Sequence, residues 1–348
     1  MAETTSPAQR KLTAASRMKP VSRVGDTIFA GASSVIAIAL AIIVILMFVF
    51  LMKTAAPTLL ANTDNFFTSR AWTTDQNPPA FGIQALLWTT VISSLLALLI
   101  AVPLSVGIAL FITQLAPRKL ASPVAFVVDL LAAVPSIVFG LWGGIVFGSS
   151  GIINGLRGAI IKALGWIPIF SEDPSWSSAT GTVYLASLVL AIMILPIITA
   201  VSRDVMAQTP HDQVEAALAL GSTRWEVIKL AVLPHSRSGI ISGSMLGLGR
   251  ALGETLAVTL ILQTMSPMAL KQNLNLSIFV GGETFASKIA GNFSEAISDP
   301  TSLGALVASA LALFVITFVV NATARLIAAK GVKRCCLLYT SDAADDLL

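Results

Sequence analysis

The chain has little charge for its length. Only 11% of its 348 residues are Asp, Glu, Lys or Arg, and 55% are hydrophobic. Soluble globular domains carry about 25% charged residues. The mean hydropathy of +0.84 agrees with this deficit. The composition therefore excludes an ordinary soluble domain and indicates a protein that lies in a lipid bilayer.

Cysteine is also scarce, and nucleotide-binding motifs are missing. The two cysteines, Cys335 and Cys336, are adjacent, which is too close for an ordinary structural disulfide. They indicate neither a redox framework nor a metal site, so we expect no metal and no cofactor. A phosphate loop of the form GxxxxGK[ST] does not occur, and we expect no ATP site and no enzymatic activity on this chain.

The last residues differ from an ordinary protein tail. Residues 336–346 resemble an in-frame translation of a sequencing-library adapter. We therefore expect the natural sequence to stop or diverge near Arg334. Residues 329–348 are interpreted as a C-terminal tail outside the fold, in which 336–346 are an artefact.

Long apolar runs are abundant. Six runs are long enough for a helix that crosses the roughly 30 Å hydrocarbon core of a bilayer. They extend over about Ile28 to Met52, Ile83 to Thr113, Pro123 to Phe147, Thr182 to Val201, Gly239 to Thr264 and Ser302 to Leu326. The sequence thus predicts an all-α integral membrane protein with about six transmembrane helices, formed by residues 28–328 after a tail of residues 1–27.

The distribution of basic residues predicts the orientation, because Lys and Arg are retained in cytoplasmic segments. With the N-terminus inside, the cytoplasmic segments hold fifteen Lys and Arg residues and the outer segments hold six. We therefore expect both termini in the cytoplasm. The basic N-terminal tail is then a cytoplasmic anchor, and no nucleic-acid partner is expected.

The third run contains helix breakers. Pro135 removes a backbone donor, and glycines at 140, 143 and 144 weaken the helix that follows. Such breaks survive in lipid only where protein or a cavity satisfies the freed backbone groups. A kink packed against other spans is favoured over a direct contact with substrate.

The cytoplasmic loop of residues 203–237 is expected to form two short helices. Thr209 is predicted to cap the first helix and Gly221 to end it. Thr223 and Glu226 repeat the capping pattern for the second helix, which Pro234 is predicted to close.

A DNA-binding helix-turn-helix is the alternative interpretation of this loop, and charge argues against it. The segment holds four basic and four acidic residues, whereas phosphate binding requires a basic surface. A protein partner fits better.

The fifth run carries glycines at 239, 243 and 247. This spacing creates a small-residue face that lets helices approach closely. Contact with a partner permease and packing within the chain are both open.

The same run holds two charges, Arg250 and Glu254, which a continuous helix would place one turn apart on one face. Charges inside a membrane are costly and must face protein or water. A mutual ion pair that neutralises the site is one interpretation. The functional one is that Arg250 donates to a tetrahedral oxyanion, while Glu254 holds Arg250 or accepts a proton from the ligand. Asp129 is a weaker candidate that could orient neighbouring helices.

The cytoplasmic loop resembles the "EAA" loop of ATP-binding-cassette importer permeases. The resemblance is carried by Glu215, Ala216, Ala217, Gly221 and the pair Leu233-Pro234. It implies a fold like that of type I importer permeases, with a cytoplasmic coupling-helix loop that docks on a separate ATPase subunit.

Residues 247–259, together with residues 134–144, are similar to the PstC family of phosphate importer permeases. The resemblance implies inorganic phosphate as the substrate and a bacterial inner-membrane location. It also implies a second permease of the PstA type, two copies of a PstB-like ATP-binding subunit and an external PstS-like phosphate-binding protein.

Two other functions stay open on the residues alone. One is a permease for another oxyanion, such as sulfate or molybdate. The other is an ion-coupled secondary transporter that uses Arg250 and Glu254 as a proton and anion site.

Overall fold

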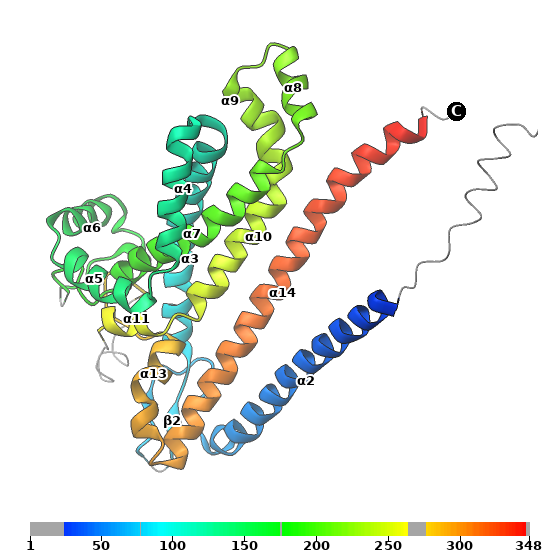
Figure 1. The fold of residues 1–348 in the computed structure, drawn as a ribbon. Coiled ribbons are helices and arrows are strands. Elements are labelled where there is room, and N and C mark those ends of the chain that lie inside the picture. Colours follow the sequence, from blue (N-terminus) through cyan, green and yellow to red (C-terminus); the bar gives the residue numbers. More distant parts are fainter. Residues whose placement is uncertain (1–23, 77, 175, 264–275, 346–348) are drawn as a thin grey trace, which may run out of the picture. The chain divides into compact units, whose positions relative to one another are not determined.

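The described part of the chain is mainly helical. A computed structural model describes residues 24–76, 78–174, 176–263 and 276–345 (Figure 1). The only sheet in these ranges is an antiparallel hairpin of β1 (Trp72–Thr73) and β2 (Ala80–Phe81), in which Trp72 pairs with Phe81. The α-helices are α2 (Val24–Ala61), α3 (Gln84–Leu110), α4 (Arg118–Ala132), α5 (Ser136–Gly148), α6 (Gly151–Leu164), α7 (Val183–Ala207), α8 (His211–Ala219), α9 (Arg224–Val227), α10 (Leu233–Leu252), α11 (Leu256–Ile261), α13 (Phe285–Ala296) and α14 (Pro300–Asp345).

The chain divides into two units, residues 1–50 and 51–348. In the first, the described residues form the N-terminal part of α2. Its large apolar side chains, such as Ile38 and Leu46, are exposed. A helix that is apolar all round is suited to a lipid environment.

Among the residues that the structure describes, four helices are long and apolar enough to cross a membrane, or five if one bent pair counts as a single span. The prediction of several apolar membrane helices is confirmed, but the count of six is not. The four are 28–61, 84–115, 183–207 and 300–323. They overlap the first, second, fourth and sixth predicted runs. The first helix continues to Ala61, nine residues beyond Met52, where the first predicted run ends.

The third predicted span is broken as expected. Helices α4 and α5 meet at an angle of 98°. Pro135 lies at the N-cap position of α5, where its missing amide hydrogen costs no helical bond. The fifth predicted span is broken as well, between α10 and α11, which the sequence analysis did not anticipate.

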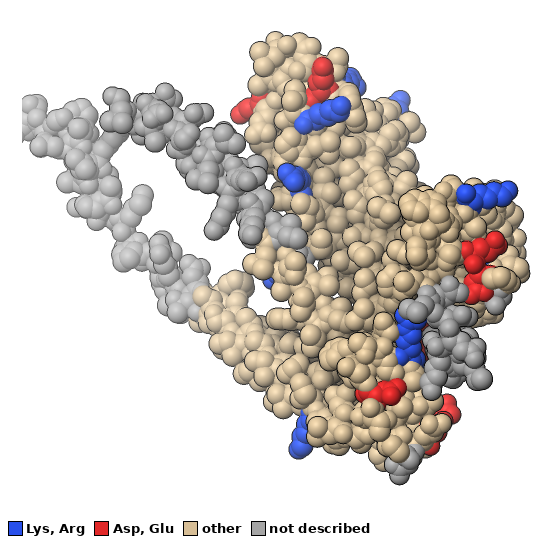
Figure 2. All heavy atoms as spheres, turned by 180° about the vertical axis from the view of Figure 1, so that it is seen from behind, with Lys and Arg blue, Asp and Glu red and all other residues tan. Residues whose placement is uncertain are grey.

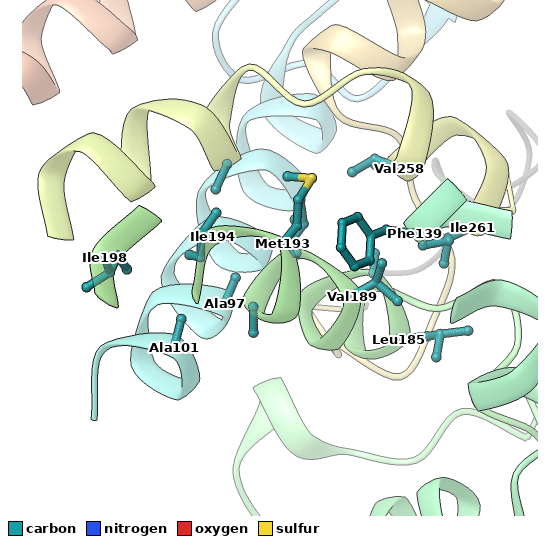
Figure 3. Close-up of a cluster of buried hydrophobic side chains, with 14 residues drawn as sticks. Ala97, Ala101, Phe139, Leu185, Val189, Met193, Ile194, Ile198, Val258 and Ile261 are labelled. Carbon is teal, nitrogen blue, oxygen red and sulfur yellow. The ribbon is translucent and has the colours of Figure 1, made fainter. Parts of the chain in front are cut away.

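The core of the second unit is built around α7. In its most apolar stretch 67% of the residues are buried, against 33% for α14 and 22% for α3. Figure 3 shows side chains from α3, α5, α7 and α11 converging on one cluster, with Phe139 beside Val189 and Met193. Because α7 supplies most of this cluster, it is the central helix against which α3, α4, α5 and α10 pack.

The glycine face of the fifth run packs within the chain. A Cβ atom at Gly239 would lie 2.4 Å from Val205 Cγ2, and one at Gly247 would lie 2.9 Å from Ile198 Cδ1. Both contacts are with α7. These glycines therefore allow α10 to approach α7 closely.

The face of the second unit seen in Figure 2 carries few charges. Figure 2 shows broad uncharged areas, with charged side chains in small separate groups. Such a surface suits a protein embedded in lipid.

Candidate functional site

Arg250 and Glu254 lie where the fifth predicted span breaks. Helix α10 ends at Leu252, and Gly253 is its C-cap residue. Arg250 is therefore in the last helical turn, where a cation is favourable for the helix dipole. Glu254 lies beyond the helix, so the prediction that both residues share one continuous helix face is wrong.

The Glu254 carboxylate turns toward the next helix. Its Oε1 accepts a hydrogen bond of 3.2 Å from the backbone amide of Ala257, in the first turn of α11. Glu254 is only 8% exposed. In the part of the chain that the structure describes, no ion pair joins it to Arg250. A mutual ion pair is thus not what neutralises these two charges here.

Both residues nevertheless line one hollow between α7, α10 and α14. Its volume is about 600 Å³. The other lining residues are Ile197, Met245, Leu246, Gly249, Gly253 and Asn321. Arg250 is exposed, and no hydrogen bond or ion pair within the described residues involves its guanidinium group. This planar group is thus available for bidentate hydrogen bonding to an anion.

The two broken spans contact each other. A Cβ atom at Gly140 of α5 would lie 2.7 Å from Cα of Ala257, in α11. The backbones of α5 and α11 therefore touch at this glycine. Because Glu254 binds the amide of the same Ala257, the packing of α5 helps to determine where Glu254 lies.

Asp129 takes part in a different interaction. Its Oδ2 atom lies 3.3 Å from Nη1 of Arg203, which joins α4 to α7. The Asp129 side chain is 51% exposed, so the pair contributes little free energy. Asp129 does not line the hollow of Arg250.

The cytoplasmic loop forms helices α8 and α9, which lie at one end of the second unit (Figure 1). Two details of the prediction are wrong. Pro210, not Thr209, is the residue that precedes α8, and the Thr209 hydroxyl donates to the Met206 carbonyl at 2.9 Å instead. Pro234 closes no helix, because α9 continues through a π-helical turn, Ile228–Val232, into α10, in which Pro234 is the second residue.

The turn between α8 and α9 is as predicted. Gly221 has a φ of +83°, which favours glycine, and its amide donates to Leu218 at 2.9 Å. The Ser222 amide donates to Ala217 at 3.2 Å. Together these bonds form a Schellman motif at the end of α8. Thr223 and Glu226 then form a complete capping box at the start of α9.

The predicted coupling residues are largely accessible. Glu215, Ala216 and Gly221 are exposed, and Ala217 is half-buried. Beside them lies a patch of exposed large apolar side chains that the sequence analysis missed. It comprises Leu218, Leu220, Trp225 and Leu230, with Leu220 88% exposed. The sequence signal that could have indicated this patch is the presence of large apolar residues on both sides of the turn glycine.

Comparison with known proteins identifies relatives over most of the chain. Residues 101–331 match the family described as binding-protein-dependent transport system inner membrane component. The chain is 46% identical over 325 residues to "Phosphate transport system permease protein PstC 2" of Mycobacterium tuberculosis, which covers 93% of this chain and 98% of that protein. It is 49% identical over 280 residues to the PstC protein of Mycobacterium leprae, covering 80% and 85%.

A solved structure shares the fold. It is a bacterial alginate ABC transporter in complex with an alginate-bound periplasmic protein, with a TM-score of 0.51 and 16% identity. The match covers 87% of this chain and 96% of that one.

Proposed function

The chain belongs to the family of binding-protein-dependent transport system inner membrane components, and on that premise we propose that it is the permease subunit of an ATP-driven importer of inorganic phosphate. Relatives named as phosphate permeases, at 46 and 49% identity, support the choice of substrate. The observation that carries the proposal is the hollow lined by Arg250 and Glu254.

The chemistry of this hollow suits a tetrahedral oxyanion. The exposed guanidinium of Arg250 offers several donors in one plane, which match two oxygens of a phosphate. The Glu254 carboxylate is acceptor-only when ionised, so it favours a ligand that still carries a proton, such as hydrogen phosphate. Because Glu254 lies at the helix break, a movement of α11 relative to α10 would alter its distance from Arg250.

The α8–α9 loop is proposed to dock on a separate ATPase subunit. Glu215, Ala216, Ala217 and Gly221, with the apolar patch beside them, form the contact surface. Depletion of charge at the centre of an interface is typical of protein docking sites. The expected partners are two PstB-like ATP-binding subunits, a PstA-like second permease and a PstS-like external phosphate-binding protein. We propose that the loop and both termini lie in the cytoplasm, on the side of the ATP-binding subunits.

Reconstitution tests the function directly. Proteoliposomes that contain the complete transporter should take up labelled phosphate only when ATP is supplied to the ATPase, and excess sulfate should not compete. Arg250→Ala should abolish most of this uptake. Arg250→Lys is the matched control, because it keeps the charge and loses the planar fork, and we expect it to restore uptake only in part.

Each alternative function predicts a different result. Uptake driven by an ion gradient without ATPase would indicate a secondary transporter. Strong competition by sulfate would indicate a permease for other oxyanions. Unimpaired phosphate uptake by the Arg250→Ala transporter would remove the role assigned to Arg250.

A further inference from the structure

A second, smaller cavity lies at the opposite end of the second unit from α8, near β1 and the first turns of α3 and α13. Its volume is about 70 Å³. One water-sized group needs roughly 10–15 Å³ on this measure, so the cavity accommodates about five to seven such groups, which is enough for the five heavy atoms of a phosphate. Its polar lining includes Arg70, Gln84, Thr89, Glu283 and Lys288. It shares no lining residue with the Arg250 hollow.

Lys288 is the unusual residue of this cavity. It is only 8% exposed, although a lysine is rarely buried. It lies in α13 four residues after the cap residue Thr284, near the positive end of that helix, where a cation is unfavourable. Its Nζ lies 2.9 Å from Oε2 of Glu283 and 5.2 Å from the ring centre of Trp72.

Arg70 adds a second cation to the lining. Its Nε donates to Oε1 of Gln84 at 2.9 Å, which orients the guanidinium beside the first turn of α3. No side chain caps α3 at Ile83, so the amides of that turn add to the positive potential. The cavity lining thus combines two cationic side chains with the carboxylate of Glu283, a set of groups that suits an anion which still carries a proton.

A threonine hydroxyl also lines this cavity. Thr89 is 5% exposed as a residue and belongs to the cavity lining. Gly282 keeps its hydroxyl accessible, because a Cβ atom at Gly282 would lie only 2.7 Å from Thr89 Oγ1. A hydroxyl can both donate to and accept from a protonated oxyanion.

We propose that this cavity is a second binding site for a protonated tetrahedral oxyanion, held by Arg70, Lys288 and Thr89. The inference rests on the proposed function in taking hydrogen phosphate as the ligand. Glu283 adds selectivity, because its carboxylate accepts the ligand's proton and repels an oxyanion without one, such as sulfate. The site lies at the end of the permease where the substrate would enter.

The test is equilibrium binding of labelled inorganic phosphate to the purified full chain. The Arg250→Ala chain serves as the background, so that binding in the larger hollow is weakened. Adding Lys288→Met should lower phosphate affinity by about tenfold or more, the loss expected for one charged hydrogen bond. Adding Glu283→Gln should let sulfate compete with phosphate.

Gly282→Ala provides an independent variant that keeps every charge. Its methyl group would displace the Thr89 hydroxyl from the cavity, so phosphate affinity should fall, and thermal unfolding of the chain reports whether it is folded. If the Lys288→Met chain does not fold, the phosphate affinity of the Gly282→Ala chain tests the proposal instead. Unchanged phosphate affinity in the folded variants overturns the inference.

ATP-dependent uptake by the wild-type transporter separates this inference from the proposed function. If the transporter takes up phosphate but phosphate binding is unaffected by the Lys288 and Gly282 substitutions, the second site is overturned and the proposed function stands. Binding that depends on these residues, in a transporter that takes up no phosphate, overturns the proposed function alone.

Discussion

Glu226 holds the start of α9 by bonds to Thr223 in which its charged carboxylate is an acceptor. Its Oε2 accepts from the Thr223 amide at 2.7 Å and from the Thr223 hydroxyl at 2.8 Å, and the Glu226 amide donates to Thr223 Oγ1 at 3.4 Å. These bonds lower the pKa of the Glu226 carboxyl below its ordinary value of 4.5, and the nearby Lys229 lowers it further. The charged form of the carboxyl is thus the one that the fold favours.

This lowered pKa predicts a pH dependence at acidic pH. The stabilisation is fully present above the ordinary pKa of Glu226 and is lost as the pH falls through the lowered, folded-state pKa. Hydrogen exchange of the Thr223 amide should therefore show protection that declines at acidic pH. The Glu226→Gln chain, which keeps an acceptor but cannot titrate, should show no such decline. Identical pH profiles in the two proteins would contradict this assignment.

At the scale of elements, the turn between α8 and α9 depends on one backbone conformation. Gly221 has a φ of +83°. This left-handed conformation costs roughly 1–2 kcal/mol for an ordinary L-residue, and it costs more for a β-branched one. Gly221→Val should therefore distort the turn and uncouple uptake from ATP hydrolysis. Gly221→Asn is the matched control, because asparagine tolerates this region. Measurements of uptake and ATPase activity on the same proteoliposomes check the prediction, and full coupling in the valine variant would refute it.

The contact between α5 and α11 gives a second prediction about elements. Gly140→Ala would place a methyl group 2.7 Å from Cα of Ala257, and overpacking of this kind costs about 1–3 kcal/mol. The variant should unfold at a lower temperature and transport more slowly, since Glu254 is bound to the displaced residue. Gly144→Ala is the control, because its nearest contact would be Ile261 Cγ1 at an ordinary 3.8 Å. Equal unfolding temperatures for both variants would disprove the effect.

Local signals in the sequence predicted several of these elements, whereas contacts between distant residues escaped it. Gly221, the Thr223 and Glu226 capping box and the break at Pro135 each depend on a few neighbouring residues, and the structure contains all three. The end of α10 before Glu254 was missed, because no proline marks it and the C-cap residue Gly253 lies inside a continuous apolar run. The close contact of α11 with α5 at Gly140 is a tertiary feature that hydropathy does not reveal.

The same distinction applies to the sites. Arg250 and Glu254 were recognisable because charges inside an apolar run are rare. Arg70 and Lys288 were counted only as outer basic residues, because they lie more than two hundred positions apart in the sequence. Their meeting in one cavity is a property of the tertiary fold.

At the scale of the whole molecule, the arrangement of charge predicts how the permease lies in the membrane. Gln76, near the hairpin, and His211, at the start of α8, are both exposed and lie at opposite ends of the second unit. In a chain without Cys335 and Cys336, Gln76→Cys should react with a membrane-impermeant maleimide in intact cells. His211→Cys should react only after the membrane is opened. The reverse pattern would invert the proposed orientation.

The Schellman turn and the capping box together have a thermodynamic consequence for the docking that we propose. Because backbone bonds already close the turn between α8 and α9, few residues need to become ordered when a partner binds. The heat capacity change of association should therefore match the apolar area covered, without the larger change of coupled folding. Association should proceed at about 10⁵–10⁷ M⁻¹s⁻¹, as between rigid partners. A loop that is already ordered should transmit a movement of the partner directly to the helices that flank it, without a prior ordering step.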